Sequence, residues 1–263
     1  MVPASGRQEI ALPKRPDYGI QATMRKTNNT LSTIAFDADD TLWENEQFFR
    51  LTQQRFFDLL ADHSSPDKIY GNLLETERKN LSYYGYGIKG FTLSMLETAL
   101  EVTGGDVSSH VMSEILKAGR EMHDHPVNTL PGVGDTLDKL AGHYRIVLIT
   151  KGDLFDQERK LAQSGLGDYF DAIEIVSEKE TSVYQRIFDQ YGDGPKKSMM
   201  VGNSLKSDVI PALEAGGWGV HVPHTSTWEL DYADRPEGFT RFLELTSITD
   251  LPALLETLSE DDA

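Results

Sequence analysis

The sequence predicts an α/β fold: a doubly wound parallel sheet interrupted by an all-helical insertion. Three observations lead to this prediction. Short apolar runs recur along the chain, segments with helical spacing separate them, and one long interval has helical spacing alone. Apolar runs of this length are typical of strands that are covered on both sides, as in parallel sheets. Their alternation with helical segments indicates helices on both faces of the sheet.

Six apolar runs mark the expected strands. They are short, often β-branched, and cover residues 33–36, 145–149, 172–176, 198–201, 218–222 and 242–245. The segments between them repeat apolar residues at helical spacing, as from Leu154 to Leu161. A further helix is expected to start with Ser207 as its N-cap and to carry Pro211 in its first turn. The glycine pair at 216–217 is expected to end that helix.

The interval from residue 45 to residue 127 has no strand pattern. Its apolar residues form three helical stripes, which are Phe49, Phe56 and Leu60; Phe91, Met95, Ala99 and Val102; and Val107, Val111, Ile115 and Met122. We therefore expect a helical cap domain at 45–127, a core domain made of 31–44 and 128–263, and an N-terminal extension at 1–30. The two chain crossings suit either a hinged lid or a rigidly docked subdomain.

Composition narrows the classes of function. The 263 residues carry 25 Lys and Arg against 42 Asp and Glu, a net charge of −17, and no cysteine. Disulfides and thiolate sites are therefore excluded, and so acidic a chain repels the phosphate backbone of nucleic acids. No apolar run is long enough to span a membrane, and residues 1–30 lack a secretory apolar core. We expect a cytoplasmic protein, a monomer or homodimer, that binds neither nucleic acid nor membrane.

Polar residues follow four of the expected strands. The four groups are Asp37-Ala38-Asp39-Asp40-Thr41, Thr150-Lys151-Gly152-Asp153, Ser177-Glu178-Lys179-Glu180, and Gly202-Asn203-Ser204 with Asp208 close behind. Ligands of open α/β sheets bind beyond the carboxyl ends of the strands. Carboxylates, a hydroxyl, an ammonium group and a carboxamide are therefore expected to meet at one edge of the sheet.

The first of these groups predicts a metal site. Two carboxylates two residues apart at a strand end can approach one point, and like charges so close need a cation or a shared proton. A hard dication such as Mg²⁺, bound through oxygen, meets that need. An EF-hand would require glycine where Leu42 stands, and the chain has no G-x-x-x-x-G-K-[ST] loop. The alternative is an acidic turn that merely solvates the end of the strand.

The order of these motifs resembles the haloacid dehalogenase (HAD) superfamily, most of whose members are phosphohydrolases. The segment from Asp37 to Thr41 matches the D-x-D-x-T signature, Thr150 matches the second motif and Lys179 the third. The group at 202–208 resembles the fourth motif, which usually has an acidic residue where Asn203 stands. The resemblance runs from about residue 31 to the C-terminus. It implies a Rossmann-like core with a helical cap inserted after the first motif.

The resemblance also implies catalytic roles in a two-step phosphoryl transfer. Asp37 is expected to attack phosphorus and to form an aspartyl-phosphate. Asp39 is expected to protonate the leaving oxygen and later to deprotonate the attacking water. Thr150 is expected to hold a phosphoryl oxygen, while Lys179 pairs with Asp37 and the transferring group. Mg²⁺ is the expected cofactor, with ligands drawn from Asp37, Asp39, Asn203 and Asp208.

Further residues are expected to bind the substrate. The resemblance places Lys151 and Gly152 at the phosphate oxygens and gives Thr41 the task of fixing the loop. In the cap segment at 80–90, Tyr84 and Tyr86 lie among glycines and offer flat faces with polar tips, which suits substrate recognition. Aromatic packing between two cap helices is the alternative for these tyrosines.

These inferences together predict a Mg²⁺-dependent phosphatase that hydrolyses a small soluble phosphate monoester, its partner being a small phosphorylated metabolite. Asp39 argues against a dehalogenase, which has no use for an acid at the leaving group. A phosphotransferase, a phosphonate-cleaving enzyme, and a non-catalytic regulator that binds Mg²⁺ or phosphate also fit the pattern. Asn203 supplies one negative charge fewer than the usual aspartate, and Asp208 is expected to compensate.

Overall fold

The computed structural model describes residues 31–260, so the predicted N-terminal extension at 1–30 lies outside the described residues. Within them, six parallel strands form one sheet in the order β3-β2-β1-β4-β5-β6. The strands are β1 (Thr33–Phe36), β2 (Arg145–Lys151), β3 (Ala172–Val176), β4 (Ser198–Gly202), β5 (Trp218–His221) and β6 (Phe242–Glu244). The chain builds outward from β1 in both directions. Such a reversal of strand order is where open α/β sheets bind ligands.

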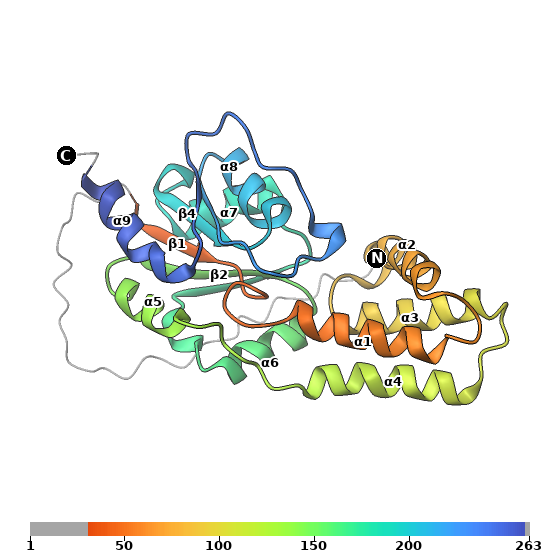
Figure 1. The fold of residues 1–263 in the computed structure, drawn as a ribbon. Helices are drawn as coiled ribbons and strands as arrows, with labels where there is room; N and C mark the ends of the chain where they lie inside the picture. Colours follow the sequence, from red (N-terminus) through yellow and green to blue (C-terminus); the bar gives the residue numbers. More distant parts are fainter. Residues whose placement is uncertain (1–30, 261–263) are drawn as a thin grey trace, which may run out of the picture.

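Helices cover both faces of the sheet (Figure 1). The helices of the core are α5 (Val133–Leu140), α6 (Leu154–Ser164), α7 (Thr181–Tyr191), α8 (Ile210–Glu214) and α9 (Leu251–Glu260). Alternate residues of β1 divide between two apolar clusters, because side chains of a strand point alternately to opposite faces. Ile34 and Phe36 join the cluster that contains α5, α6 and α9, whereas Ala35 joins that of α7 and α8. The predicted doubly wound parallel sheet is confirmed.

Four helices lie between β1 and α5 and form a bundle beside the sheet (Figure 1). They are α1 (Glu46–Leu59), α2 (Pro66–Tyr84), α3 (Ile88–Val102) and α4 (Ser109–Asp124). All three predicted stripes contribute to the separate apolar cluster of this bundle, and α2 adds Ile69 and Leu73. We call these helices the cap; its boundaries at residues 45 and 127 stay a prediction. Among the described residues, no helix has both the length and the apolar character that a membrane span requires.

The two crossings between core and cap lie side by side. Trp43, on the outward path, forms an antiparallel bridge with Thr129, on the return path. The Glu44 amide donates to the Asn128 carbonyl at 3.0 Å, and the Leu130 amide donates to the carbonyl of Leu42 at 2.9 Å. The cap therefore joins the core through one narrow, hydrogen-bonded pair of segments.

The structure corrects two local predictions. The helix expected to start at Ser207 begins earlier, because the Ser204 hydroxyl accepts the Ser207 amide and opens a π-helical turn that runs into α8. Pro211 does lie in the first turn of α8. The strand predicted at 145–149 continues to Lys151, which places Thr150 within β2.

We predict opposite effects for two glycine substitutions in the cap. A Cβ at Gly119 would lie 2.4 Å from the Thr92 hydroxyl, which already donates to the Ile88 carbonyl at 2.7 Å. Gly119→Ala should therefore lower the free energy of unfolding by about 1–3 kcal/mol through overpacking. Gly71→Ala, in helix α2 with nothing within 4 Å, should raise it by about 0.5–1 kcal/mol. Urea unfolding measures both, and equal shifts would contradict the prediction.

Candidate active site

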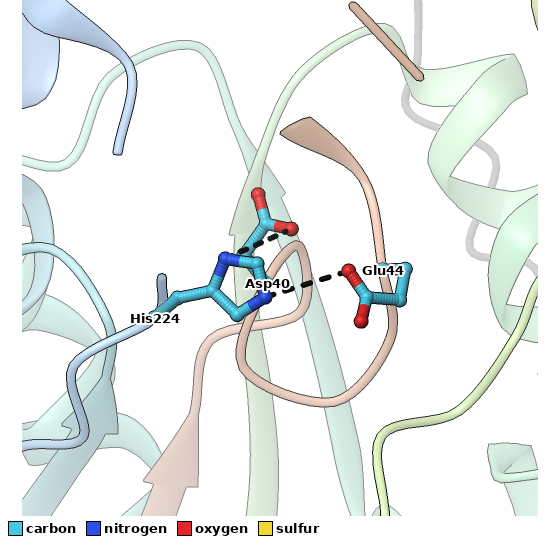
Figure 2. A group of neighbouring side chains, drawn as sticks. All are labelled: Asp40, Glu44 and His224. Carbon is cyan, nitrogen blue, oxygen red and sulfur yellow. Dashed lines mark ion pairs between the residues drawn. The ribbon is translucent and has the colours of Figure 1, made fainter. Parts of the chain in front are cut away.

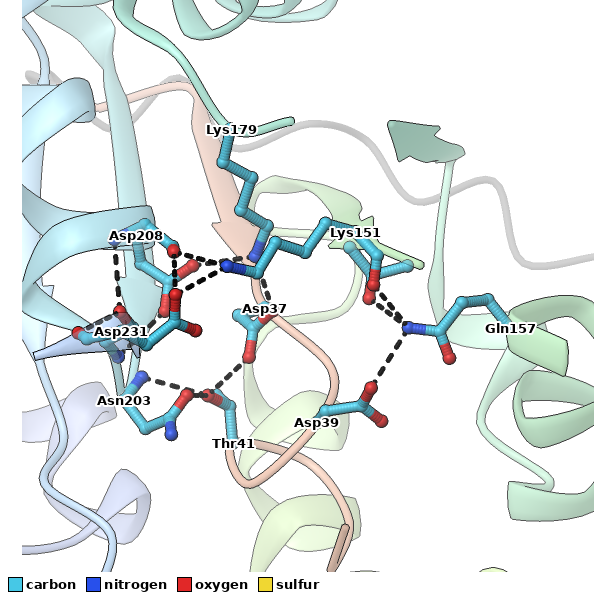
Figure 3. A network of polar contacts seen from close by, with 12 residues as sticks. Asp37, Asp39, Thr41, Lys151, Gln157, Lys179, Asn203, Asp208 and Asp231 are labelled. Carbon is cyan, nitrogen blue, oxygen red and sulfur yellow. Dashed lines mark hydrogen bonds and ion pairs between the residues drawn. The ribbon is translucent and has the colours of Figure 1, made fainter. Parts of the chain in front are cut away.

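Asp37, the first residue after β1, is buried beside the Lys179 ammonium, which has the opposite charge, and the Asp208 carboxyl group, which has the same charge (Figure 3). Its amide donates to the Val201 carbonyl of β4 at 2.9 Å, which fixes the backbone at the sheet edge. The Lys179 ammonium, which precedes α7, contacts Asp37 Oδ1 and lies 2.7 Å from Asp208 Oδ1. One buried lysine thus bridges two buried carboxyl groups that come from different loops.

Burial and the neighbouring charges shift the pKa values of Asp37 and Lys179. Desolvation, reinforced by the charge of Asp208, raises the pKa of Asp37 to about 7, although Lys179 acts in the opposite direction. Burial opposes the charge of Lys179, but the carboxylates of Asp208 and Asp37 outweigh it and hold the pKa of Lys179 above its usual value. Lys179 therefore carries a positive charge beside Asp37. A further cation at this place would favour the ionised form of the Asp37 carboxyl group.

Thr41 and Asn203 complete the loop around Asp37. The Thr41 hydroxyl donates to Asp37 Oδ2 at 3.0 Å and accepts the Asn203 amide at 3.0 Å. With its side-chain amide turned so that the nitrogen faces these oxygens, Asn203 donates to the Asp39 carbonyl oxygen at 3.2 Å and to Asp37 Oδ2 at 3.3 Å. In this orientation the Asp39 carbonyl oxygen and Asp37 Oδ2 both face the Asn203 side-chain nitrogen.

The same oxygen atoms fit a hard dication. Asp37 offers Oδ2, Asp39 its carbonyl oxygen and Asn203 its side-chain oxygen in the other amide orientation, while Asp208 lies beside them with Oδ2 accepting the Ser204 amide at 2.9 Å. The Asp39 carboxylate does not face this point. Any contribution of Asp39 to a metal site would thus come from its main chain.

Three side chains hold the Asp39 carboxylate on the other side of the loop. Trp43 Nε1 donates to it at 2.7 Å and Gln157 Nε2 at 3.1 Å, and Lys160 Nζ contacts both oxygens at 2.9 and 3.0 Å. Gln157 and Lys160 are buried and project from α6. Asp37 and Asp39 are therefore held by separate sets of partners.

The end of β2 forms the facing wall. Gln157 Nε2 donates to the Thr150 hydroxyl at 2.7 Å, while Gln157 Oε1 is buried and has no partner among the described residues. Lys151 Nζ contacts Asp231 at 2.6 Å and Ser207 at 2.7 Å. Gly152 has a φ of 147°, a conformation that favours glycine and turns the chain toward α6.

A cavity of about 140 Å³ adjoins this group and is lined from both core and cap. Tyr86 lines it, donates to Glu178 at 2.6 Å, and has its ring centroid 4.3 Å from the Lys151 ammonium. Tyr84 is not among the lining residues: it ends α2, is half exposed, and approaches Glu97 of the cap at 3.5 Å. The substrate role predicted for both tyrosines is thus retained as a proposal for Tyr86 alone.

Two carboxyl groups line the cap side of the cavity. Glu77 of α2 and Glu46 of α1 are 8% and 9% exposed. Burial, with the charge of Glu46, raises the pKa of Glu77 to about 8. Burial, with the charge of Asp40, raises the pKa of Glu46 to about 7. The cap thus adds carboxyl groups that are costly to ionise in the empty cavity.

Asp40, Glu44 and His224 form a second cluster at the crossing (Figure 2). His224 lies between the two carboxylates, 3.7 Å from Asp40 and 3.4 Å from Glu44, and the three side chains are close enough to hold a metal ion. The Asp40 carboxylate already accepts the amides of Asn45 at 2.9 Å and Glu46 at 3.0 Å. We therefore describe this cluster as a connection between the catalytic loop and α1.

Several residues of the site were not predicted from the sequence. Gln157 and Lys160 carry a usable signal, because they lie one turn apart in the helix that follows β2 and so face the same sheet edge. Glu46 and Glu77 are acidic positions in cap helices, and such positions are usually solvated. Asp231 lies in the long segment after β5, where no periodicity marks it.

Comparison with known proteins identifies the family. The family model described as "haloacid dehalogenase-like hydrolase" matches residues 31–216, more than half of the chain. The chain belongs to the haloacid dehalogenase-like hydrolases. The HAD resemblance, the fold class and the assignment as an enzyme of hydrolase type are thereby confirmed. The roles of the individual residues stay predictions.

Named relatives of this HAD hydrolase include two curated proteins and one solved structure. A glyceraldehyde 3-phosphate phosphatase of Methanothermobacter thermautotrophicus is 27% identical over 87% of this chain and all of its own length. A pyrimidine 5′-nucleotidase of Escherichia coli is 25% identical, over 84% of this chain and 96% of the relative. The crystal structure of a haloacid dehalogenase-like hydrolase from Xanthomonas campestris is 39% identical, with a TM-score of 0.78 over 89% of this chain and 94% of that one.

We predict that Glu77 makes the HAD hydrolase less stable as pH rises. The folded protein keeps the Glu77 proton up to about pH 8, whereas the unfolded chain releases it near pH 4.5. In that window Glu77 lowers the free energy of unfolding by up to about 1.4 kcal/mol per pH unit. Glu77→Gln should flatten this dependence. Urea unfolding at pH 5.5, 7 and 8.5 measures it.

Glu75→Gln is the matched control for this prediction, because Glu75 lies on the same helix outside the cavity lining. Its unfolding should keep the wild-type dependence on pH. Parallel curves for wild type and Glu77→Gln between pH 5.5 and 8.5 would contradict the prediction.

Proposed function

We propose that this HAD hydrolase is a Mg²⁺-dependent phosphatase that hydrolyses a small phosphate monoester through an aspartyl-phosphate on Asp37. One observation carries the proposal: a buried carboxyl group contacts a buried lysine and faces a cavity that also holds a second, separately bound aspartate. The names of the curated relatives, a phosphatase and a nucleotidase, support the same reaction class.

Asp37 is the proposed nucleophile. Its Oδ1 is held by Lys179 and its Oδ2 by Thr41, so the carboxylate is fixed before substrate binds. In the first step an Asp37 oxygen bonds to phosphorus while the bond from phosphorus to the ester oxygen breaks. In the second, water attacks the phosphorus and Asp37 is regenerated. Lys179 offsets the negative charge that gathers where the two anions meet.

Asp39 is the proposed acid and base. It donates a proton to the departing ester oxygen and later accepts one from the attacking water, so it ends each cycle in its starting state. Gln157 and Lys160 are positioning residues that aim the Asp39 carboxyl group into the cavity. Thr150 and the backbone at Lys151 and Gly152 are proposed to hold the phosphoryl oxygens.

Mg²⁺ is the proposed cofactor, held by Asp37, the main chain of Asp39, Asn203 and Asp208. When bound it supplies positive charge that lets an anionic nucleophile approach an anionic phosphate. The donor set supports this choice, because it consists of oxygen atoms and lacks sulfur or imidazole. A cytoplasmic location stays a prediction.

Asp37→Asn should lower the hydrolysis of p-nitrophenyl phosphate by about 10³-fold or more, because an amide is a poor nucleophile. Phosphate release with and without Mg²⁺ measures the loss, and beryllium trifluoride should form an adduct at Asp37 in the wild type only. Asp58→Asn, an exposed position on α1, is the control and should keep wild-type activity. Appreciable turnover by Asp37→Asn would exclude the proposed nucleophile.

Asp39→Ala should act selectively on esters with poor leaving groups, since they depend on a proton for departure. We expect a loss of about 10²-fold or more for alkyl phosphates and a much smaller loss for p-nitrophenyl phosphate. Single-turnover rates across a series of phenyl and alkyl phosphates measure the difference. A uniform loss across the series would argue against the acid role.

A further inference from the structure

The cavity has an uneven distribution of charge. Among the described residues, nine carboxyl groups and three lysines line it. All three lysines project from the core and each is already paired: Lys179 with Asp37, Lys160 with Asp39 and Lys151 with Asp231. No lysine, arginine or histidine lines the cavity from the described cap helices. Beyond the phosphate site, the lining formed by the described residues thus holds no free cation for a second anionic group.

Glu77 is the feature that needs explanation. It is only 8% exposed and lines the cavity, yet no hydrogen bond or ion pair to its carboxyl group is found among the described residues. Burial and the charge of Glu46 are what act on it, and both disfavour its ionised form. A buried carboxyl group without a partner is costly. Glu77 therefore contributes a buried, unpartnered carboxyl group to the lining of the space that a ligand would fill.

Glu46 extends this acidic wall. Arg50 approaches it at 3.4 Å, but the Arg50 side chain is half exposed and does not line the cavity. Asn80 lies one turn after Glu77 on α2 and lines the same wall, with its amide nitrogen donating to Ser94 at 3.2 Å. The described lining on the cap side therefore includes two carboxyl groups and an amide whose nitrogen is already bound to Ser94.

We propose that the substrate carries an ammonium group that binds between Glu77 and Glu46, so that the enzyme prefers amino-substituted phosphate monoesters. This inference rests on the proposed function, which places the phosphate at Asp37. An ammonium group donates three hydrogen bonds, and its positive charge favours the ionised forms of both carboxyl groups. Phe91 and Leu81 also line the cavity and offer apolar surface to a carbon skeleton between ammonium and phosphate.

A second group of different chemistry fits this wall less well. A carboxylate or a second phosphate would place a negative charge beside Glu46 and Glu77, where no free cation among the lining residues offsets it and where it makes their ionisation costlier still. A hydroxyl group can form hydrogen bonds with the two carboxyl groups but brings no positive charge that would favour their ionised forms. The expected order of affinity is therefore ammonium, then hydroxyl, then carboxylate.

Matched ligands on one skeleton test this order. We would measure binding of 2-aminoethyl phosphate, 2-hydroxyethyl phosphate and phosphoglycolate to the Asp37→Asn protein by calorimetry with Mg²⁺. Glucosamine 6-phosphate and glucose 6-phosphate repeat the comparison on a longer skeleton. In at least one series the amine should bind about tenfold or more tightly than the alcohol, as a charge-assisted hydrogen bond implies. Phosphoglycolate should bind more weakly than both 2-aminoethyl phosphate and 2-hydroxyethyl phosphate.

Glu77→Gln, added to Asp37→Asn, should reduce the preference for the amine to about twofold or less. Glu75→Gln in the same background should keep it in full, since Glu75 lies outside the cavity lining. Equal binding of amine and alcohol in both series, tighter binding of phosphoglycolate, or a preference that survives Glu77→Gln would overturn the inference. Turnover by the wild type is measured separately. If no phosphate is released, the proposed function is wrong, whereas the order of the ligand affinities tests the ammonium site.

Discussion

The contact of Lys179 with Asp37 and Asp208 is the interaction on which the rest of the site depends. Three ionisable groups lie buried together at the edge of the sheet, and none could stay there alone without a large desolvation cost. The order of the strands makes the contact possible, because β4 lies next to β1 and brings Asp208 to the side of Asp37. Lys179 reaches them from the loop after β3. The order of the strands thus determines which charged groups surround Asp37.

The two aspartates of the first motif lie only two positions apart, yet their environments differ. Asp37 faces Lys179 and Thr41, whereas Asp39 faces Trp43, Gln157 and Lys160. Both residues follow the end of β1, where the turn of the chain carries Asp39 away from Asp37 and toward α6. The two carboxyl groups therefore do not compete for the same partners, as the separate roles proposed for Asp37 and Asp39 require.

The core could be predicted from the sequence because its signals are local. Apolar runs mark the strands, and polar residues after them mark the sheet edge, so Asp37, Thr150, Lys179 and Asp208 could be placed together. Contacts between distant segments leave no such signal. Tyr84 was expected at the cavity, but α2 continues through it and turns it toward Glu97. Glu77 and Asp231 could not be assigned to the site from the sequence, because only the fold brings α2 and the segment after β5 to the cavity.

The Asp40 backbone has one further consequence. Its φ of 61° is unusual for a residue with a side chain, and its carboxylate binds the first amides of α1. The turn that carries Asp39 is thus clamped to the start of the first cap helix. Any swing of that helix away from the sheet must either break these hydrogen bonds or twist the turn. A movement of the cap relative to the core would therefore also change the position of the turn that carries Asp39.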